Sequence, residues 1–334
     1  MRIGLVYNLR TDHPDLATGP VDVFADWDVA EPMAELRDGL RRTGHEVVDV
    51  GDPHRLLAGD LDLDLVFNVA EMTGYRYREA LVPSLLELLG IPYTFAAPDG
   101  MVLTLDKNVS NLLVRQAGGP VADWTIARSA DDVLLHRFLD EHAGARFLVK
   151  PVAEGSSMGI TKDAVCDTPA AVRRLVRASV ETYAQPALVQ LFLAGRELTC
   201  AVVEVDGRPQ ALGPIEIESG TGEGSELFDF DRKEALGDEV VECFPLHAGD
   251  PLYGPAQEIS VLAFAATGCR DVARVDLRCA AGSEGLSFLE INALPGLDPL
   301  SAEAMTDDYD ALLEAIVASA MRRAAALAGA RRPA

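Results

Sequence analysis

The stretch FLEINALPGL, at residues 288–297, decides the fold of this chain. Read with the two-residue period of a β-strand, it places Phe288, Glu290 and Asn292 on one face. The proline-glycine pair that follows ends the strand, as turn residues do. A buried carboxylate without a partner would be costly, so a carboxylate and an amide two residues apart indicate that the strand coordinates a ligand near its end.

A second strand is predicted just upstream, in ARVDLRCA at residues 273–280. The AGSEG sequence between the two strands is typical of a turn, so the pair forms an antiparallel hairpin. If the turn is centred on Ser283, Asp276 lies opposite Glu290 and Arg274 lies opposite Asn292, whereas a shift of one residue would separate them. Directly opposed side chains point to the same face with Cβ atoms about 5 Å apart, so we expect these four to form one polar cluster.

The cluster has the chemistry of a metal site. Asp276, Glu290 and Asn292 offer hard oxygen ligands of the kind that suit Mg²⁺ or Mn²⁺, and such sites leave positions for substrate phosphates. A metal-bound nucleotide is therefore expected here. The alternative is a hairpin held only by ion pairs, with Asp276 bound to Arg274 and Glu290 bound to Arg278.

A Gly/Ser loop, residues 154–159, follows another predicted strand in LVKPVAEGSSMGI. Lys150 ends that strand, and the loop combines glycines, which allow close approach of a backbone, with two serine hydroxyls. Successive N–H groups in such a loop can bind phosphate, although the GxxxxGK[ST] pattern of the P-loop is absent. A simple hairpin turn is the alternative for the loop taken alone.

Length and composition limit the classes of function. The 334 residues are enough for two or three domains, and 49% hydrophobic with 25% charged residues is ordinary for a globular enzyme. The formal net charge of −24 argues against a nucleic-acid partner. The five cysteines form no CxxC pair, no apolar stretch is long enough for a membrane span, and no GxGxxG follows the first strand. We therefore expect a cytoplasmic protein with free thiols, no membrane contact and no dinucleotide cofactor.

The first hundred residues alternate between strands and helices. Strands are predicted at 2–8, 45–50 and 63–71, with a helix at 31–43 between the first two, which indicates a parallel sheet with helices on its faces. Further helices are predicted at 76–90, 98–119, 130–143, 169–182 and 255–267, and further strands at 91–95, 146–152, 187–195 and 197–207.

Two long segments have the composition of loops. Residues 8–30 hold five aspartates, among them Asp22, and Arg10 is their only basic residue. Long loops in compact domains are usually functional or disordered, so this acidic segment is either simply solvated or a wall that recognises a substrate ammonium group. Residues 213–240 are rich in glycine and acidic residues, and we predict that they form a lid.

Five sequence blocks resemble, in their order and spacing, an ATP-grasp ligase of the D-alanine–D-alanine ligase family. They are TLDKNVSNLLVRQAG, FLVKPVAEGSSMGI, LVQLFLAGRELTCAVV, ARVDL and FLEINALPGL. The resemblance covers roughly residues 85–305, and the first eighty residues resemble the family only in layout. It implies an α/β ATP-grasp fold, with a Rossmann-like parallel α/β domain at 1–104 and two α+β domains, at 105–190 and 191–334, that enclose ATP.

The resemblance also implies roles for residues in these blocks. Lys107 and Lys150 would contact the α- and β-phosphates, Lys233 in the lid would reach the γ-phosphate, and Arg274 would stabilise an oxyanion. Gln190 stands where the family has an acidic residue, so its contact with adenine must differ. The resemblance also implies that Glu154, Ser156 and the catalytic Ser157 lie over the phosphates. Phe192 and Leu193 would contact adenine at the hinge, and Glu197 would contact the ribose. Two Mg²⁺ ions would be bound by Asp276, Glu290 and Asn292, with Glu290 shared between them.

The predicted function is that of an ATP-dependent carboxylate–amine ligase, which joins two small amino-acid-like substrates through an acyl phosphate. The alternatives are a D-alanine–D-alanine ligase itself, a non-catalytic ATP-binding regulatory scaffold and a phosphotransferase. Bulky polar residues replace family residues near the first substrate, so we expect that substrate to be larger or more polar than D-alanine. Candidate substrate residues are Glu31, Glu71, Arg76, Arg78, Gly296 and Ser301, and a homodimer is left open.

Overall fold

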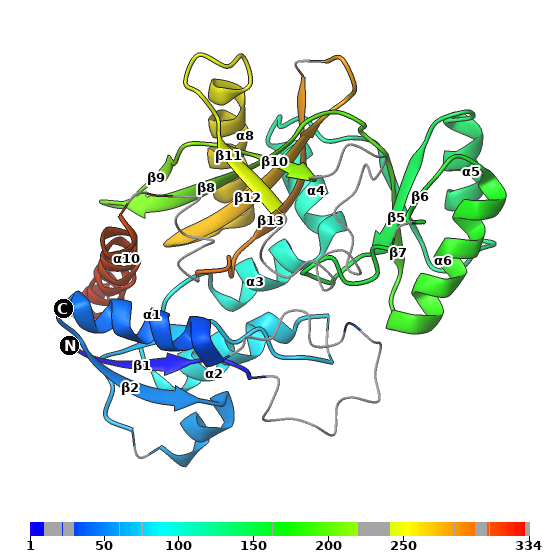
Figure 1. The fold of residues 1–334 in the computed structure, drawn as a ribbon. Coiled ribbons are helices and arrows are strands. Elements are labelled where there is room, and N and C mark those ends of the chain that lie inside the picture. The colour runs from blue at the N-terminus through cyan, green and yellow to red at the C-terminus, as the bar shows by residue number, and fades with distance from the viewer. Residues whose placement is uncertain are drawn as a thin grey trace.

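The computed structural model of the chain describes residues 1–9, 22, 30–59, 61–74, 76–161, 163–219, 241–283, 285–297, 306 and 308–330. At residues 30, 31, 218, 219, 241, 242 and 330 it describes only the backbone. The described residues form three sheets with helices packed against them (Figure 1). Across these ranges, every helix is too short or too polar to cross a membrane.

The N-terminal sheet has three parallel strands in the order β2-β1-β3, which confirms the predicted βαβ arrangement. Its elements are β1 (Arg2–Val6), α1 (Ala30–Arg42), β2 (Glu46–Gly51), η3 (Pro53–Ala58), β3 (Leu65–Asn68), η4 (Arg78–Ala80) and α2 (Leu81–Leu89). The prediction of a strand at 91–95 is wrong. Only Tyr93 bridges Val66, because the left-handed φ of 72° at Phe95 turns the chain away from the sheet.

The helix predicted at 98–119 is in fact two helices, α3 (Pro98–Leu105) and α4 (Lys107–Gln116). Between them Asp106 has an extended backbone, and its carboxylate accepts two N–H groups of the next turn at 3.1 and 3.2 Å. This N-cap starts a new helix and explains the break. As a result, Lys107 lies in the first turn of α4.

The second sheet has four antiparallel strands in the order β4-β7-β5-β6. Its elements are β4 (Trp124–Ala127), α5 (Val133–Glu141), β5 (Phe147–Pro151), β6 (Val165–Cys166), α6 (Pro169–Tyr183) and β7 (Ala187–Leu191). One face packs against α5 and α6 in a buried apolar cluster that includes Val149 and Val189 (Figure 1). Since side chains alternate along a strand, Lys150 and its partner Leu188 lie on the opposite face.

The third sheet has six antiparallel strands, five in the order β11-β10-β8-β12-β13 and one, β9, paired with β8. Its elements are β8 (Glu197–Val205), β9 (Arg208–Ala211), β10 (Ile215–Ser219), β11 (Val241–Pro245), α8 (Tyr253–Thr267), β12 (Val272–Cys279), β13 (Leu286–Asn292) and α10 (Tyr309–Ala330). Residues of this sheet, α8, α10 and the N-terminal sheet share the largest hydrophobic core. The other predicted helices and strands are present, with ends that differ by a few residues.

The predicted hairpin of β12 and β13 has the expected register at its functional end. Asp276 pairs with Glu290, as predicted. Leu277 then pairs with Phe288, which leaves Leu289 as the extra residue of a β-bulge. Phe288 is therefore fully buried on the apolar face with Leu277, and the prediction that it shares a face with Glu290 is wrong.

Candidate active site

Two lysines from separate elements converge on one glutamate. Lys150 lies on β5, Lys107 lies at the start of α4, and Glu290 lies on β13. The Nζ atom of Lys150 donates to Oε2 of Glu290 at 2.9 Å, and that of Lys107 lies 3.6 Å from the same oxygen. Burial alone would raise the pKa of Glu290, but the two ammonium groups outweigh it and hold that pKa well below its usual range. An ionised carboxylate thus joins three motifs that are far apart in the sequence.

The hairpin places the other predicted metal ligands beside Glu290. Asp276 lies directly opposite it, and Arg274 lies opposite Asn292. Oδ1 of Asp276 accepts the hydroxyl of Thr199 at 2.7 Å, and Oδ2 accepts the amide of Asn292 at 3.2 Å. Arg274 contacts both oxygens, with Nε at 3.1 Å and Nη2 at 3.2 Å. Thr199, on β8, was missed because one threonine in a buried strand carries no sequence signal.

Ion pairs alone do not account for this hairpin. The Arg274–Asp276 pair of the alternative forms, but Arg278 pairs with Glu197 at 2.9 Å instead of with Glu290. The remaining donor set suits a hard divalent cation, because it offers two carboxylates, one of them held ionised by lysines. No three His, Cys, Asp or Glu side chains of the described ranges gather as a metal site by themselves.

The Gly/Ser loop begins next to this cluster. The ammonium group of Lys107 donates to the backbone carbonyl of Glu154, and Arg78 forms an ion pair with Oε2 of Glu154 at 3.1 Å. Ser156 and Ser157 have φ angles of 43° and 60°, in the left-handed region that few non-glycine residues adopt. The loop therefore turns tightly beside a buried lysine, as a phosphate-binding loop requires.

The predicted adenine hinge lies at the end of β7. Gln190 is buried on the same face of the sheet as Lys150, and its Nε2 has no hydrogen-bond partner among the residues described. The guanidinium groups of Arg146 and Arg278 both lie over the ring of Phe192, each 4.9 Å from the ring centre. A buried amide N–H without a partner is costly, so this face of the sheet suits a polar ligand that accepts a hydrogen bond.

The remaining predicted nucleotide contacts, Leu193 and Glu197, lie between the end of β7 and the start of β8. Leu193 lies in the connection between β7 and β8, and Glu197 is the first residue of β8. Burial raises the pKa of Glu197, although the ion pair with Arg278 opposes the shift. The predicted ribose contact is therefore a half-buried carboxylate at the edge of the same cluster that holds Asp276 and Glu290.

The two arginines predicted to select a substrate already have partners within the chain. Arg78 is buried, with 3% of its surface exposed, and pairs with Glu154. Arg76 is half-exposed and forms an ion pair with Asp106, the N-cap of α4. Both therefore connect the segment before α2 to the predicted nucleotide site.

Glu71 belongs to the electrostatic surroundings of Arg274. Asp276 raises the pKa of Arg274 most, burial opposes the shift, and Glu290 and Glu71 add to it. An acidic side chain of the N-terminal part thus adds negative charge to the surroundings of the predicted oxyanion site. Gly296 lies just after β13. Some predicted site residues lie outside the described residues, namely Lys233, Ser301 and the side chain of Glu31. The same holds for most of the predicted lid.

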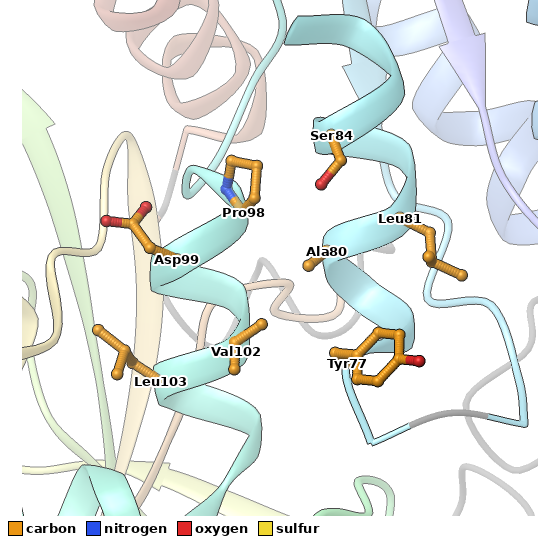
Figure 2. A pocket seen from close by; sticks show the side chains of 8 residues that line it. All are labelled: Tyr77, Ala80, Leu81, Ser84, Pro98, Asp99, Val102 and Leu103. Atoms are coloured by element: carbon orange, nitrogen blue, oxygen red, sulfur yellow. The ribbon is translucent and has the colours of Figure 1, made fainter. Parts of the chain in front are cut away.

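A separate groove of about 480 Å³ lies between α3 and the η4–α2 segment (Figure 2). Its walls are mostly apolar, with Tyr77 and Leu81 on one side and Val102 and Leu103 on the other. Among the described residues that line it, Asp99 carries the only charged side chain. These residues offer no cationic group for a nucleotide phosphate, in contrast to the Lys107–Glu290–Lys150 cluster.

The amino-acid sequence of this chain is similar to the sequences of known proteins. A sequence profile described as the D-ala D-ala ligase C-terminus matches residues 113–317. The uncharacterized protein y4sG of Sinorhizobium fredii is 36% identical over 269 residues, which cover 78% of this chain and 75% of that protein. A D-alanine–D-alanine ligase of Methylobacterium radiotolerans is 32% identical over 271 residues, which cover 79% of this chain and 82% of that protein.

Solved structures show the same fold. The D-alanine–D-alanine ligase from Bacillus anthracis, in a crystal structure complexed with ATP, aligns with a TM-score of 0.70. The alignment covers 97% of this chain and 98% of that one, at 20% sequence identity. At this identity the likeness concerns the fold, and it confirms the predicted fold class.

Proposed function

The chain belongs to the D-alanine–D-alanine ligase family, and from this premise we propose that it joins two small amino-acid-like substrates by an amide bond, through an acyl phosphate. It is an ATP-dependent carboxylate–amine ligase with an ATP-grasp fold. The observation that carries the proposal is the convergence of Lys107 and Lys150 on Glu290, beside Asp276 and the Gly/Ser loop. These groups gather the charges that phosphoryl transfer from a metal-bound nucleotide needs.

The first half-reaction is phosphoryl transfer. A carboxylate oxygen of the first substrate attacks the γ-phosphorus of ATP, and ADP leaves. Lys107 and Lys150 neutralise phosphate charge, and N–H groups of the Gly/Ser loop bind phosphate oxygens. Asp276, Glu290 and Asn292 would hold two Mg²⁺ ions, which would offset the negative charge that builds up on the transferred group. Both lysines are almost fully buried, so they act in surroundings where water screens their charge little.

The second half-reaction is acyl transfer. The amine nitrogen of the second substrate attacks the acyl carbon, and the carbonyl oxygen gains negative charge. The amine then gives up a proton and phosphate leaves, which completes the amide. Arg274 would stabilise this oxyanion. Both oxygens of Asp276 hold its guanidinium group in a fixed orientation, which supports this role.

For the first substrate, we propose an amino acid larger or more polar than D-alanine. Glu71, which adds to the pKa shift of Arg274, is an acidic group that would attract an extra cationic or donor group of the substrate. Arg76, half-exposed beside α4, can pair with an extra carboxylate if it exchanges Asp106 for the substrate. The second candidate function is ligation of two D-alanines, which the D-alanine–D-alanine ligase of Methylobacterium radiotolerans supports.

A panel assay separates these two candidates. Phosphate release is measured with D-alanine as sole substrate and, in parallel, with pairs of L- and D-amino acids, and mass spectrometry identifies each amide. We expect at least one pair with a polar or longer first substrate to exceed D-alanine alone in kcat/KM by about tenfold or more, because a buried polar pocket rejects a substrate that leaves its charges unpaired. If D-alanine alone gives the best kcat/KM of the panel, the proposed substrate preference is overturned and the second candidate stands.

A further inference from the structure

One aspartate of the acidic segment at residues 8–30 contacts the Gly/Ser loop. Oδ2 of Asp22 accepts the N–H of Gly159 at 2.8 Å and the hydroxyl of Tyr183 at 2.6 Å. Asp22 is 7% exposed, although its segment is rich in charged residues. Tyr183 is the last residue of α6, and both burial and Asp22 raise its pKa, so the hydroxyl stays protonated and donates to the carboxylate.

The backbone of the loop is unfavourable without outside contacts. Ser156, Ser157 and Gly159 have positive φ angles of 43°, 60° and 72°. At Gly159 a Cβ atom would lie 2.6 Å from the Pro151 ring and 2.9 Å from the Tyr183 ring, so the chain packs closely against both. A strained backbone of this kind persists only where the surrounding structure fixes it.

Contacts from two parts of the chain fix the loop. At its start, Gln185 accepts the N–H of Ala153 at 2.7 Å, and Arg78 donates to the carbonyl of Ala153 at 3.1 Å. At its end, Asp22 and Tyr183 hold Gly159. Tyr183 and Gln185 come from the end of α6, whereas Asp22 and Arg78 come from the N-terminal part of the chain. The loop is thus held at both ends across the boundary between these parts.

Asp22 is poorly explained by stability alone. Its other oxygen, Oδ1, is buried and has no hydrogen-bond partner in the parts of the chain that the structure describes. A buried carboxylate oxygen without a partner is costly. Through space, a negative charge beside a phosphate-binding loop would also weaken the binding of an anion. Its favourable contribution is the fixed acceptor that it gives to Gly159 and Tyr183.

We propose that Asp22 is a positioning residue, which holds the Gly/Ser loop in the conformation that binds nucleotide phosphates. This inference rests on the proposed function, since it requires the loop to bind phosphate. It gives the acidic segment a second task besides any contact with substrate. The N-terminal part then sets the affinity for the nucleotide through hydrogen bonds to the loop, and not through contact with the nucleotide itself.

The test compares Asp22→Ala with Asp22→Asn. Asp22→Ala removes the acceptor, and we expect it to raise the dissociation constant of ATP with Mg²⁺ about tenfold or more, with a matching rise in KM for ATP and a much smaller change in kcat. Asp22→Asn keeps a carbonyl acceptor for Gly159, so it should bind ATP nearly as the unchanged protein does. Hydrogen exchange should rise at residues 153–160 in Asp22→Ala and stay unchanged in β8 and β12, which also shows that this variant is folded.

Asp163→Ala is the matched control, because it removes one exposed negative charge just after the same loop. It should leave ATP binding unchanged or slightly tighter. Tyr183→Phe removes the other partner of Asp22 and should weaken ATP binding in the same direction as Asp22→Ala. If Asp22→Ala binds ATP as tightly as the unchanged protein, or if Asp22→Asn loses as much affinity as Asp22→Ala, the inference is overturned. If the unchanged protein does not bind ATP with Mg²⁺, the proposed function itself fails.

Discussion

Replacing Glu290 with glutamine is expected to lower turnover by more than about a hundredfold at saturating ATP and Mg²⁺. In the unchanged protein, the ammonium groups of Lys150 and Lys107 lie 2.9 and 3.6 Å from Oε2 of Glu290. The amide of glutamine has nearly the size of the carboxylate but no charge, so both lysines lose their anionic partner. The substitution also removes the carboxylate that both proposed metal ions share. Phosphate release in the presence of the best substrate pair measures the loss.

The matched control for this variant is Glu141→Gln. Glu141 is exposed on α5 and pairs with Arg137 at 2.8 Å, and α5 covers the face of the second sheet opposite to Lys150. Its replacement should leave turnover unchanged. Circular dichroism and the thermal midpoint of both variants show whether each is folded at the assay temperature. Near-normal turnover of a folded Glu290→Gln variant would exclude the hairpin as the metal site.

Arg274→Lys is expected to lower kcat by about a hundredfold to a thousandfold, the usual effect of losing an oxyanion donor. Lysine keeps the positive charge but cannot contact both oxygens of Asp276 as the guanidinium does, at 3.1 and 3.2 Å. Because Arg274 is proposed to act on the acyl group and not on the nucleotide, KM for ATP should change by less than roughly threefold.

Arg115→Lys is the corresponding control. Arg115 is partly exposed, pairs with Asp123 at 2.9 Å and lies over the ring of Trp124, and among the described residues it contacts neither Asp276 nor Glu290. Its replacement should change neither kcat nor KM for ATP. If Arg274→Lys instead raises KM for ATP and leaves kcat intact, Arg274 binds nucleotide and the proposed role in acyl transfer is wrong.

The sequence was enough to predict the cluster because its residues carry charges in otherwise apolar strands. The alternation in β12 and the turn residues after it set Asp276 opposite Glu290, and the pairing is present. The contact of Lys150 with Glu290 was not predicted, because the sequence analysis assigned Lys150 only to nucleotide phosphates. Local spacing was sufficient only for the pairing within the hairpin.

Contacts that depend on packing between distant segments could not be predicted. The bulge at Leu289 reverses the alternation of side chains, and no glycine marks it in the sequence. Asp106 looked like one more polar residue within a continuous helix, although it caps a new one. The contacts of Asp22 with Gly159 and of Arg78 with Glu154 join residues far apart in the sequence, and a single sequence holds no record of such pairs.

The central claim is that an acyl phosphate links the carboxylate to the amine, and a first substrate labelled with oxygen-18 in its carboxylate tests it most directly. The carboxylate oxygen that attacks phosphorus stays on phosphorus when the amine attacks the acyl carbon. For each amide formed, mass spectrometry should therefore find one labelled oxygen in the released phosphate and one fewer in the product than in the substrate. Unlabelled phosphate alongside amide formation, with the labelled oxygen that the amide has lost found instead in AMP or in water, would contradict the account.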